Sequence, residues 1–300
     1  MSKNKAWISA LRLRTLPLSL SGILLGSGAA HYNGYWDTTI FSLAMVTTIL
    51  FQIVSNLAND LGDGMKGTDN KERIGPERAV QSGIISQKAM KAAVILTALL
   101  SLVSAMMLIY FGATDMPKSI IIYYIILAVT CVIAAITYTI GKKAYGYHGM
   151  GDIMVFIFFG AVSVLGVYSL YAKSFLNVNL LLAIFVGLQS TAVLNLNNMR
   201  DYHNDAASNK NTLVVKLGQS NAKIYHLLLV LTALVSLTLF LDHLRQPLAF
   251  LVLLPSILLF IHLRKVMKVK NPKEFDPELK KVALTTFALS LTTTILLFLL

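Results

Sequence analysis

The sequence is poor in charged side chains. Only 13% of its 300 residues are Asp, Glu, Lys or Arg, about half the usual share of a soluble domain, whereas 56% are hydrophobic. This composition excludes an ordinary soluble globular protein, and the many hydrophobic residues exclude a disordered chain. Cysteine is nearly absent too. With Cys131 alone, the chain has no internal disulfide and no metal site built from cysteines, and its six histidines lack the spacing of metal ligands.

Long stretches without charge take up most of the chain. A helix needs about 20 mainly apolar residues to cross the hydrocarbon core of a membrane. The sequence therefore predicts an all-α, polytopic membrane protein with nine transmembrane helices, forming a single domain over residues 1–300. The nine charge-free stretches are Thr15–Trp36, Thr38–Asn59, Ala92–Ala113, Ser119–Gly141, Ile153–Ala172, Ser174–Met199, Ile224–Leu241, Gln246–Leu263 and Val282–Leu300.

Basic residues exceed acidic ones by twelve, and their distribution is uneven. With nine spans, all of the 26 Lys and Arg except Lys118, Lys173 and Arg245 fall on the side that holds the N-terminus. Lys and Arg accumulate in cytoplasmic links, so we expect a cytoplasmic N-terminus and a C-terminus on the opposite side. The lack of a transit segment favours the bacterial plasma (inner) membrane.

Two of the cytoplasmic links begin alike, although four spans separate them. Each leaves its span through Asn-Leu-x-Asn, at residues 56–59 and 195–198, and continues into paired acids. Helical spacing places each set on one face of a helix, and repeated halves around a shared site are common in membrane proteins. The alternative is a pair of solvated, salt-bridged loops. The two sets are Asn56, Asn59, Asp60 and Asp63, and Asn197, Asp201 and Asp205.

These oxygen-rich sets predict a Mg²⁺ site that binds a polyphosphate. Mg²⁺ typically takes one or two carboxylates together with substrate phosphates, and fixed Arg and Lys side chains bind phosphate oxygens. The sequence has no P-loop pattern, so ATP hydrolysis is not expected. The cations beside the acids are Lys66, Arg73, Arg78, Arg200 and Lys210.

Other polar features have two interpretations each. Tyr138, Tyr145 and Tyr147 flank the link between spans four and five, either as tyrosines of the membrane interface or as π-faces beside a carbocation. Asp152 enters span five either as a helix N-cap or as a site residue. The glycines at 62, 64 and 67, with Gly-Pro at 75–76, are expected to break the second helix into a structured loop.

The acid-rich links resemble those of a known family. Asn56-x-x-Asn59-Asp60-x-x-Asp63, with Asp69 and Arg73-Ile-Gly-Pro-Glu-Arg78 after it, closely resembles the first motif of the 1,4-dihydroxy-2-naphthoate polyprenyltransferases, within the UbiA superfamily of intramembrane prenyltransferases. Three further segments are similar to the family's in the same order. They are Arg12-x-Arg14-Thr-Leu-Pro17, Tyr138-Thr with Tyr145-Gly-Tyr-His-Gly-Met-Gly-Asp152, and Asn197-Asn-Met-Arg-Asp201-x-x-x-Asp205.

Three positions depart from the wider pattern. Gly67 stands where the superfamily often has a third Asp, and Asp69 follows, as in the naphthoate branch. Asn209 stands where Gly is usual, and Asn tolerates a positive φ. Arg14 replaces a common Lys and keeps the charge.

The resemblance implies nine helices around a central cavity with cytoplasmic cap loops. It also implies Mg²⁺ as cofactor, a polyprenyl diphosphate donor, and 1,4-dihydroxy-2-naphthoate as acceptor, with decarboxylation and oxidation to demethylmenaquinone. Asn59 and Asp63 would bind one Mg²⁺, and Asp201 and Asp205 the other. Supporting and catalytic roles would fall to Asn56, Asp60, Asp69 and Tyr138, and diphosphate binding to Arg12, Lys66, Arg73, Arg78, Arg200 and Lys210.

Two other functions remain alternatives. One is prenyl transfer to another aromatic acceptor, such as 4-hydroxybenzoate or homogentisate. The other is transport, which would favour ionisable groups inside the spans, yet all fourteen Asp and Glu lie outside the charge-free stretches. The expected partners are therefore the two substrates and the lipid bilayer, with no nucleic acid.

Overall fold

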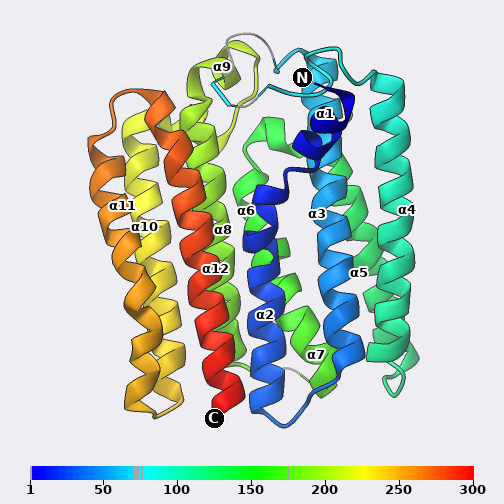
Figure 1. Cartoon of the computed structure of the whole chain (residues 1–300), viewed down its shortest axis with the longest axis vertical. Coiled ribbons are helices and arrows are strands. Elements are labelled where there is room, and N and C mark those ends of the chain that lie inside the picture. The colour runs from blue at the N-terminus through cyan, green and yellow to red at the C-terminus, as the bar shows by residue number, and fades with distance from the viewer. Residues whose placement is uncertain (1, 70–73, 76, 175) are drawn as a thin grey trace.

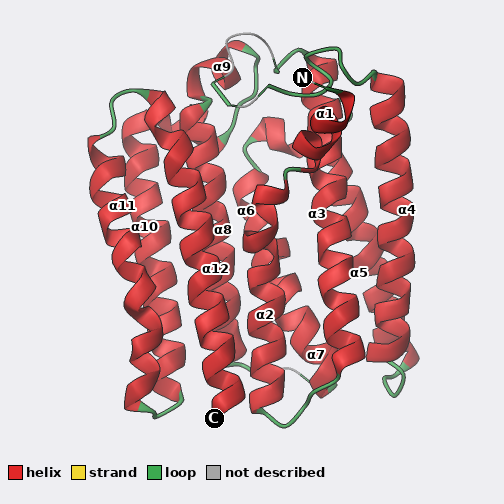
Figure 2. Cartoon of the chain, viewed as in Figure 1, coloured by secondary structure: helices red, strands yellow, loops and turns green. Residues whose placement is uncertain are grey.

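The computed structural model describes residues 2–69, 74–75, 77–174 and 176–300. Over these residues the chain consists of helices and connecting loops, without a strand (Figure 2). Nine of its helical segments are long and apolar enough to cross a membrane. The prediction of an all-α, nine-span protein is therefore confirmed for the described part of the chain.

Each span overlaps one of the charge-free stretches, although the ends of the spans differ from the ends of the stretches. The first contains α1 (Lys3–Leu11) and α2 (Leu16–Tyr32), and the fifth contains α6 (Gly151–Val155), a π-helical turn region Phe156–Gly166, and α7 (Val167–Ala172). The eighth ends in α11 (Ile257–Lys268). The others are α3 (Thr38–Lys66), α4 (Gln87–Gly112), α5 (Lys118–Thr137), α8 (Asn179–Arg200), α10 (Leu213–His243) and α12 (Phe275–Leu299).

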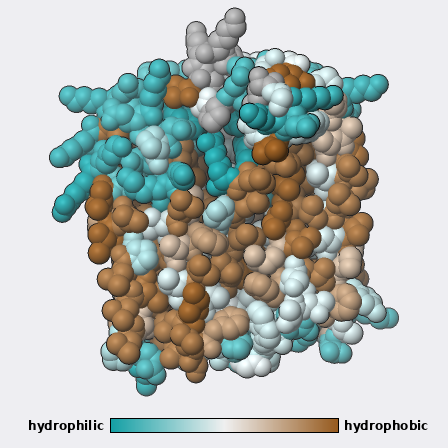
Figure 3. Space-filling view, viewed as in Figure 1, coloured by the Kyte–Doolittle hydropathy of each residue, from teal (hydrophilic) through white to brown (hydrophobic). Residues whose placement is uncertain are grey.

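The two ends of the bundle differ in polarity. The N-terminus, α1 and the short helix α9 (Tyr202–Ala207) lie at one end, and the C-terminus lies at the other (Figure 1). Hydrophilic side chains gather mainly at the N-terminal end, above a broad hydrophobic band (Figure 3). A hydrophobic band of this kind suits the interior of a bilayer.

Local sequence accounts for where the spans begin and end. The Asp37 carboxylate caps α3 by accepting from the amides of Thr39 and Ile40, at 2.6 and 3.0 Å. The helix ends at Gly67, whose φ of 72° suits a residue without a side chain. Capping therefore defines the helix whose C-terminal end carries the first acid motif.

The prediction that glycines break the second span is wrong for Gly62 and Gly64, which lie inside α3. A Cβ on Gly62 would stand 2.5 Å from Thr139 Oγ1, and one on Gly64 would stand 2.8 Å from Val80 Cγ1. These glycines allow close packing rather than a turn. Helix α3 therefore stays continuous through Asp63, and the loop begins only after Lys66.

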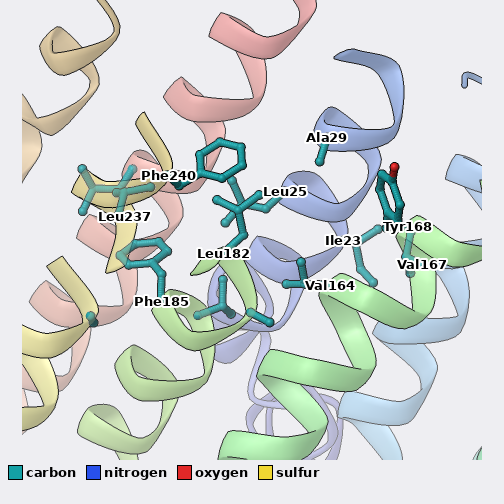
Figure 4. Packing of buried hydrophobic residues seen from close by; sticks show 14 of the residues in the cluster. Ile23, Leu25, Ala29, Val164, Val167, Tyr168, Leu182, Phe185, Leu237 and Phe240 are labelled. Atoms are coloured by element: carbon teal, nitrogen blue, oxygen red, sulfur yellow. The ribbon is translucent and has the colours of Figure 1, made fainter. Parts of the chain in front are cut away.

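Two hydrophobic cores share helices α3 and α4. The larger core contains Leu182 and Phe185 of α8 and Phe240 of α10, close to Leu25 of α2 (Figure 4). A second core joins α1, α3, α4 and the segment 79–85.

Candidate functional site

A cavity of about 540 Å³ extends into the bundle from its polar end. One part of its wall is polar and charged, and the other part is mainly apolar. Acids, amides and cations line the polar part. They come from the ends of α3 and α8, from α9, from the start of α12, and from the loop positions Arg12, Asp69, Arg78 and Lys210. Apolar side chains line the remainder, among them Phe51, Leu108, Ile109, Leu127, Phe158, Phe159, Val162 and Leu170.

Helix α3 presents Asn59 and Asp63 to this cavity. Thr139 donates to Asn59 Oδ1 at 3.4 Å. Asp63 is 7% exposed, and its Oδ1 accepts a 2.7 Å hydrogen bond from the hydroxyl of Tyr147. The two oxygen donors of the first motif therefore lie where a ligand in the cavity can reach them.

The other two polar residues of this motif hold neighbouring segments. The carboxylate of Asp60 accepts from the amides of Ala79 and Val80 at 3.2 and 3.1 Å, so the prediction of one shared face is wrong for Asp60. The reason is that adjacent helical residues point about 100° apart. Asn56 lines the cavity and donates to Leu11 O at 2.9 Å and to Thr15 Oγ1 at 3.2 Å. Both act as supports.

The second motif is divided between two helices. Helix α8 ends at Arg200, Asp201 follows with φ −92° and ψ 9°, and Asp205 lies in α9. Asn197, Asp201 and Asp205 nevertheless all line the cavity. The bend therefore preserves the clustering that uniform helical spacing predicts.

Arg200 is engaged by acids and is only 1% exposed. Its Nε and Nη2 donate to the two oxygens of Asp201 at 2.9 and 2.7 Å, and its Nη1 donates to Asp276 at 2.6 Å. Nη2 also donates to Asn197 Oδ1 at 2.8 Å. Arg200 therefore fixes the carboxylate of Asp201 by a bidentate pair and also lines the cavity, and its binding of diphosphate stays a prediction.

Lys210 joins the two motifs. Its Nζ lies 3.6 Å from Asp63 Oδ2 and 3.7 Å from Asp205 Oδ1, in a side chain that is 9% exposed. Burial opposes the charge of Lys210, but Asp63 and Asp205 outweigh it and raise the pKa of the ammonium above its ordinary value. Lys210 is therefore charged at neutral pH.

Tyr147 organises the loops that cover this end of the cavity. Its hydroxyl contacts Thr68 Oγ1 at 2.6 Å in addition to Asp63, and Lys66 Nζ lies 3.8 Å from the centre of its ring. Its carbonyl accepts from the amide of Asn211 at 3.1 Å. Burial and the charge of Asp63 raise the pKa of Tyr147, so the phenol is neutral and donates.

Sequence reasoning missed the roles of Tyr147 and Asp276. In the sequence, Tyr147 stands out only as one of three tyrosines in its link, and its contact with Asp63 joins residues 84 positions apart. Asp276 had one available signal, since it is one of few acids in the Lys-rich stretch that precedes the last span.

The remaining predicted residues are placed as follows. Asp69 and Arg78 line the cavity with their Oδ2 and Nε atoms 3.7 Å apart, and Arg12 lines it as well. Tyr138 follows α5 at the cavity wall, where burial raises its pKa to about 12. Asp152 is buried, with Tyr225 of α10 beside it. Arg73 lies outside the described residues.

The donor set fits magnesium bound together with a phosphate ligand. Within the described residues, His, Cys, Asp and Glu form no group of three or more that could enclose a metal alone. The cavity instead offers Asn59 with Asp63, and Asp201 with Asp205. Mg²⁺ commonly takes only one or two carboxylates and completes its shell with phosphate and water oxygens.

Comparison with known proteins decides the family. The model of the UbiA prenyltransferase family matches residues 19–279. The chain belongs to the UbiA prenyltransferase family. As a UbiA protein it is a prenyltransferase with a multi-pass membrane fold, as the sequence predicted.

Individual relatives agree with this assignment. The chain is 42% identical to 1,4-dihydroxy-2-naphthoate octaprenyltransferase of Escherichia coli K12, over 94% of this chain and 91% of the relative. It is 43% identical to the protein of the same name from Haemophilus influenzae, over 77% and 75%. A solved UbiA homologue from Aeropyrum pernix shares the fold, with a TM-score of 0.68 at 15% identity, over 96% of this chain and 99% of that one.

Proposed function

We propose that this UbiA prenyltransferase transfers a polyprenyl group from an allylic diphosphate to 1,4-dihydroxy-2-naphthoate in menaquinone biosynthesis. One observation carries the proposal: two acid-rich helix ends, far apart in sequence, line the polar end of a single cavity whose remainder is mainly apolar. The names of the relatives at 42% and 43% identity support this acceptor.

The proposal includes Mg²⁺ at the two oxygen-rich positions. Asn59 and Asp63 would hold one ion, and Asp201 and Asp205 would hold the other. When bound, the ions neutralise the negative charge that develops on the departing diphosphate. The buried guanidinium of Arg200 holds Asp201 in place, since it forks onto both carboxylate oxygens.

The two parts of the cavity wall match the two chemical parts of the prenyl donor. Lys66, Lys210 and Arg78, with Arg12 at the cavity wall, would bind the diphosphate as fixed positive charges. The apolar lining would receive the hydrocarbon chain, because burying apolar surface is favourable and leaves no polar group unpaired. Tyr138 would stand beside the allylic carbon as a neutral ring, a role consistent with its raised pKa.

The reaction proceeds by carbon–oxygen cleavage and carbon–carbon bond formation. The electron pair of the allylic C–O bond leaves with the diphosphate, and the electron-rich naphthoate ring attacks the allylic carbon. Loss of the carboxylate as CO₂ restores the aromatic ring. Oxidation of the resulting quinol by an external electron acceptor then gives demethylmenaquinone.

We further propose that the polar end faces the cytoplasm of a bacterial cell, with the C-terminus across the plasma membrane. The concentration of Lys and Arg at the N-terminal end supports this orientation. Cysteine-accessibility labelling of single-cysteine variants at Ser2 and at Leu300 would test it. Labelling of both positions from the same side would contradict it.

The acceptor can be tested with purified protein. Labelled polyprenyl diphosphate and Mg²⁺ would be supplied with 1,4-dihydroxy-2-naphthoate, 4-hydroxybenzoate or homogentisate in separate reactions, each with a chelator control. We expect a prenylated product from the naphthoate alone, and none after chelation. Transfer to 4-hydroxybenzoate without transfer to the naphthoate would overturn the assignment.

A further inference from the structure

Lys210 differs from Arg200 in how it contacts acids. The contacts between Arg200 and Asp201 are 2.7 and 2.9 Å long, within the usual range of charge-assisted hydrogen bonds. Lys210 Nζ stands 3.6 Å from Asp63 and 3.7 Å from Asp205, too far for a strong hydrogen bond to either. The ammonium thus balances the charge of both acids without being locked to one of them.

The backbone of Lys210 is fixed although its side chain is long and flexible. The amide of Lys210 donates to Asp205 O at 2.8 Å, and the amide of Thr212 donates to Lys210 O at 2.9 Å. Asn209, with a φ of 54°, makes the turn before it. Four rotatable side-chain bonds therefore allow the ammonium to move while its base stays in place.

We infer that Lys210 is an exchangeable counterion, which occupies the space between Asp63 and Asp205 until a metal–diphosphate complex arrives. The inference deepens the proposed function and rests on it. Two buried carboxylates that face one cavity repel each other unless a cation lies between them. The ammonium supplies that cation in the absence of metal, and it competes with a divalent ion for the same oxygens.

A diphosphate changes this competition. When a diphosphate binds, its negative oxygens lie in the same cavity, where the Lys210 ammonium can pair with them. One ion then gains Asp63 and the other gains Asp205, while the Lys210 ammonium gains the diphosphate as its partner. Metal alone should bind weakly, and metal with diphosphate should bind tightly. Such coupling is reciprocal, so metal must also tighten the binding of diphosphate by the same factor.

Binding of Mn²⁺ to the purified full-length protein tests the inference without catalysis. Free Mn²⁺ would be measured by electron paramagnetic resonance, with no substrate present. Lys210→Gln should bind Mn²⁺ at least about tenfold more tightly than the unaltered protein, because the competing ammonium is gone. A tenfold change in affinity corresponds to about 1.4 kcal/mol. Lys210→Arg should bind it as weakly as the unaltered protein.

Lys143→Gln is the matched control. It removes one positive charge from the exposed link between spans four and five and should leave Mn²⁺ binding unchanged. Equal Mn²⁺ affinity in Lys210→Gln and in the unaltered protein would overturn the inference. An equal gain in Lys143→Gln would overturn it as well, because the effect would then reflect net charge alone.

A second measurement needs no variant. Inorganic diphosphate should tighten Mn²⁺ binding to the unaltered protein by about tenfold or more, after correction for Mn²⁺–diphosphate in solution. Absence of this coupling would overturn the inference even where Lys210→Gln fails to fold. Neither measurement depends on the aromatic acceptor, so failure of the proposed function would be seen separately, as absence of naphthoate prenylation.

Discussion

The two acid-rich ends of the cavity are built differently. On α3, Asp63 extends from a continuous helix and is held by the Tyr147 hydroxyl and the distant Lys210 ammonium. On α8, Asp201 follows the helix end and is clamped by Arg200, which Asp276 holds in turn. The charged contacts of Asp201 are thus shorter than the one between Asp63 and Lys210, so we call the α8 end the rigid half and the α3 end the adjustable half.

The largest expected effect comes from removing, in either half, a carboxylate that we propose binds Mg²⁺. Asp63→Ala and Asp201→Ala should each lower the rate of prenyl transfer by about 10²–10³, comparable to the loss of one preorganised group that stabilises the leaving charge. Product formation in reconstituted membranes measures this. Asp60→Asn is the control beside Asp63, and it should lose far less because its carboxylate holds a loop.

A substitution in the rigid half should lower the thermal stability of the protein. Arg200→Met removes the guanidinium that forks onto the buried Asp201 carboxylate, and breaking a buried ion pair costs about 3–5 kcal/mol. Thermal unfolding in detergent should show a clear fall in Tm. Arg264→Met, which changes an exposed arginine in the same way, should not. Equal Tm values for the two variants would show that the clamp contributes nothing.

The adjustable half should respond through ligand affinity. Tyr147→Phe removes one hydrogen bond to Asp63, worth about 1 kcal/mol, so the KM for diphosphate donor or Mg²⁺ should rise about fivefold. Tyr171→Phe is the control. It removes a buried hydroxyl of α7 that donates to Ser27 of α2, and it should leave both KM values unchanged. A fall in kcat alone for Tyr147→Phe would assign the phenol to the chemical step instead.

The smallest effect concerns pH. Folding raises the pKa of Lys210, so its charge stabilises the folded state fully at pH values below the ordinary pKa of 10.5. This contribution is lost only as the pH rises through the higher pKa of the folded state. The difference in unfolding free energy between the unaltered protein and Lys210→Gln should stay constant from neutral pH to about pH 9. A difference that declines within this range would contradict the raised pKa.

The sequence predicted the spans and the clustering of acids because both follow from local patterns. Charge-free length defines a span, and helical spacing brings Asn59 and Asp63 to one face. Contacts between distant segments followed no such pattern. Arg200 meets Asp276 across 76 residues, and Gly62 packs against Thr139, so neither the clamp nor the continuity of α3 could be derived from spacing.

The central claim is that both halves act on one departing diphosphate, and a double-mutant comparison tests it most directly. Prenylated naphthoate would be quantified for Asp63→Ala, Asp201→Ala and the variant carrying both changes. When two groups stabilise one transition state as a unit, removing both lowers the reaction rate little more than removing either one. We therefore expect the double variant to be about as inactive as either single variant. Effects that multiply, or full activity in either single variant, would contradict the account.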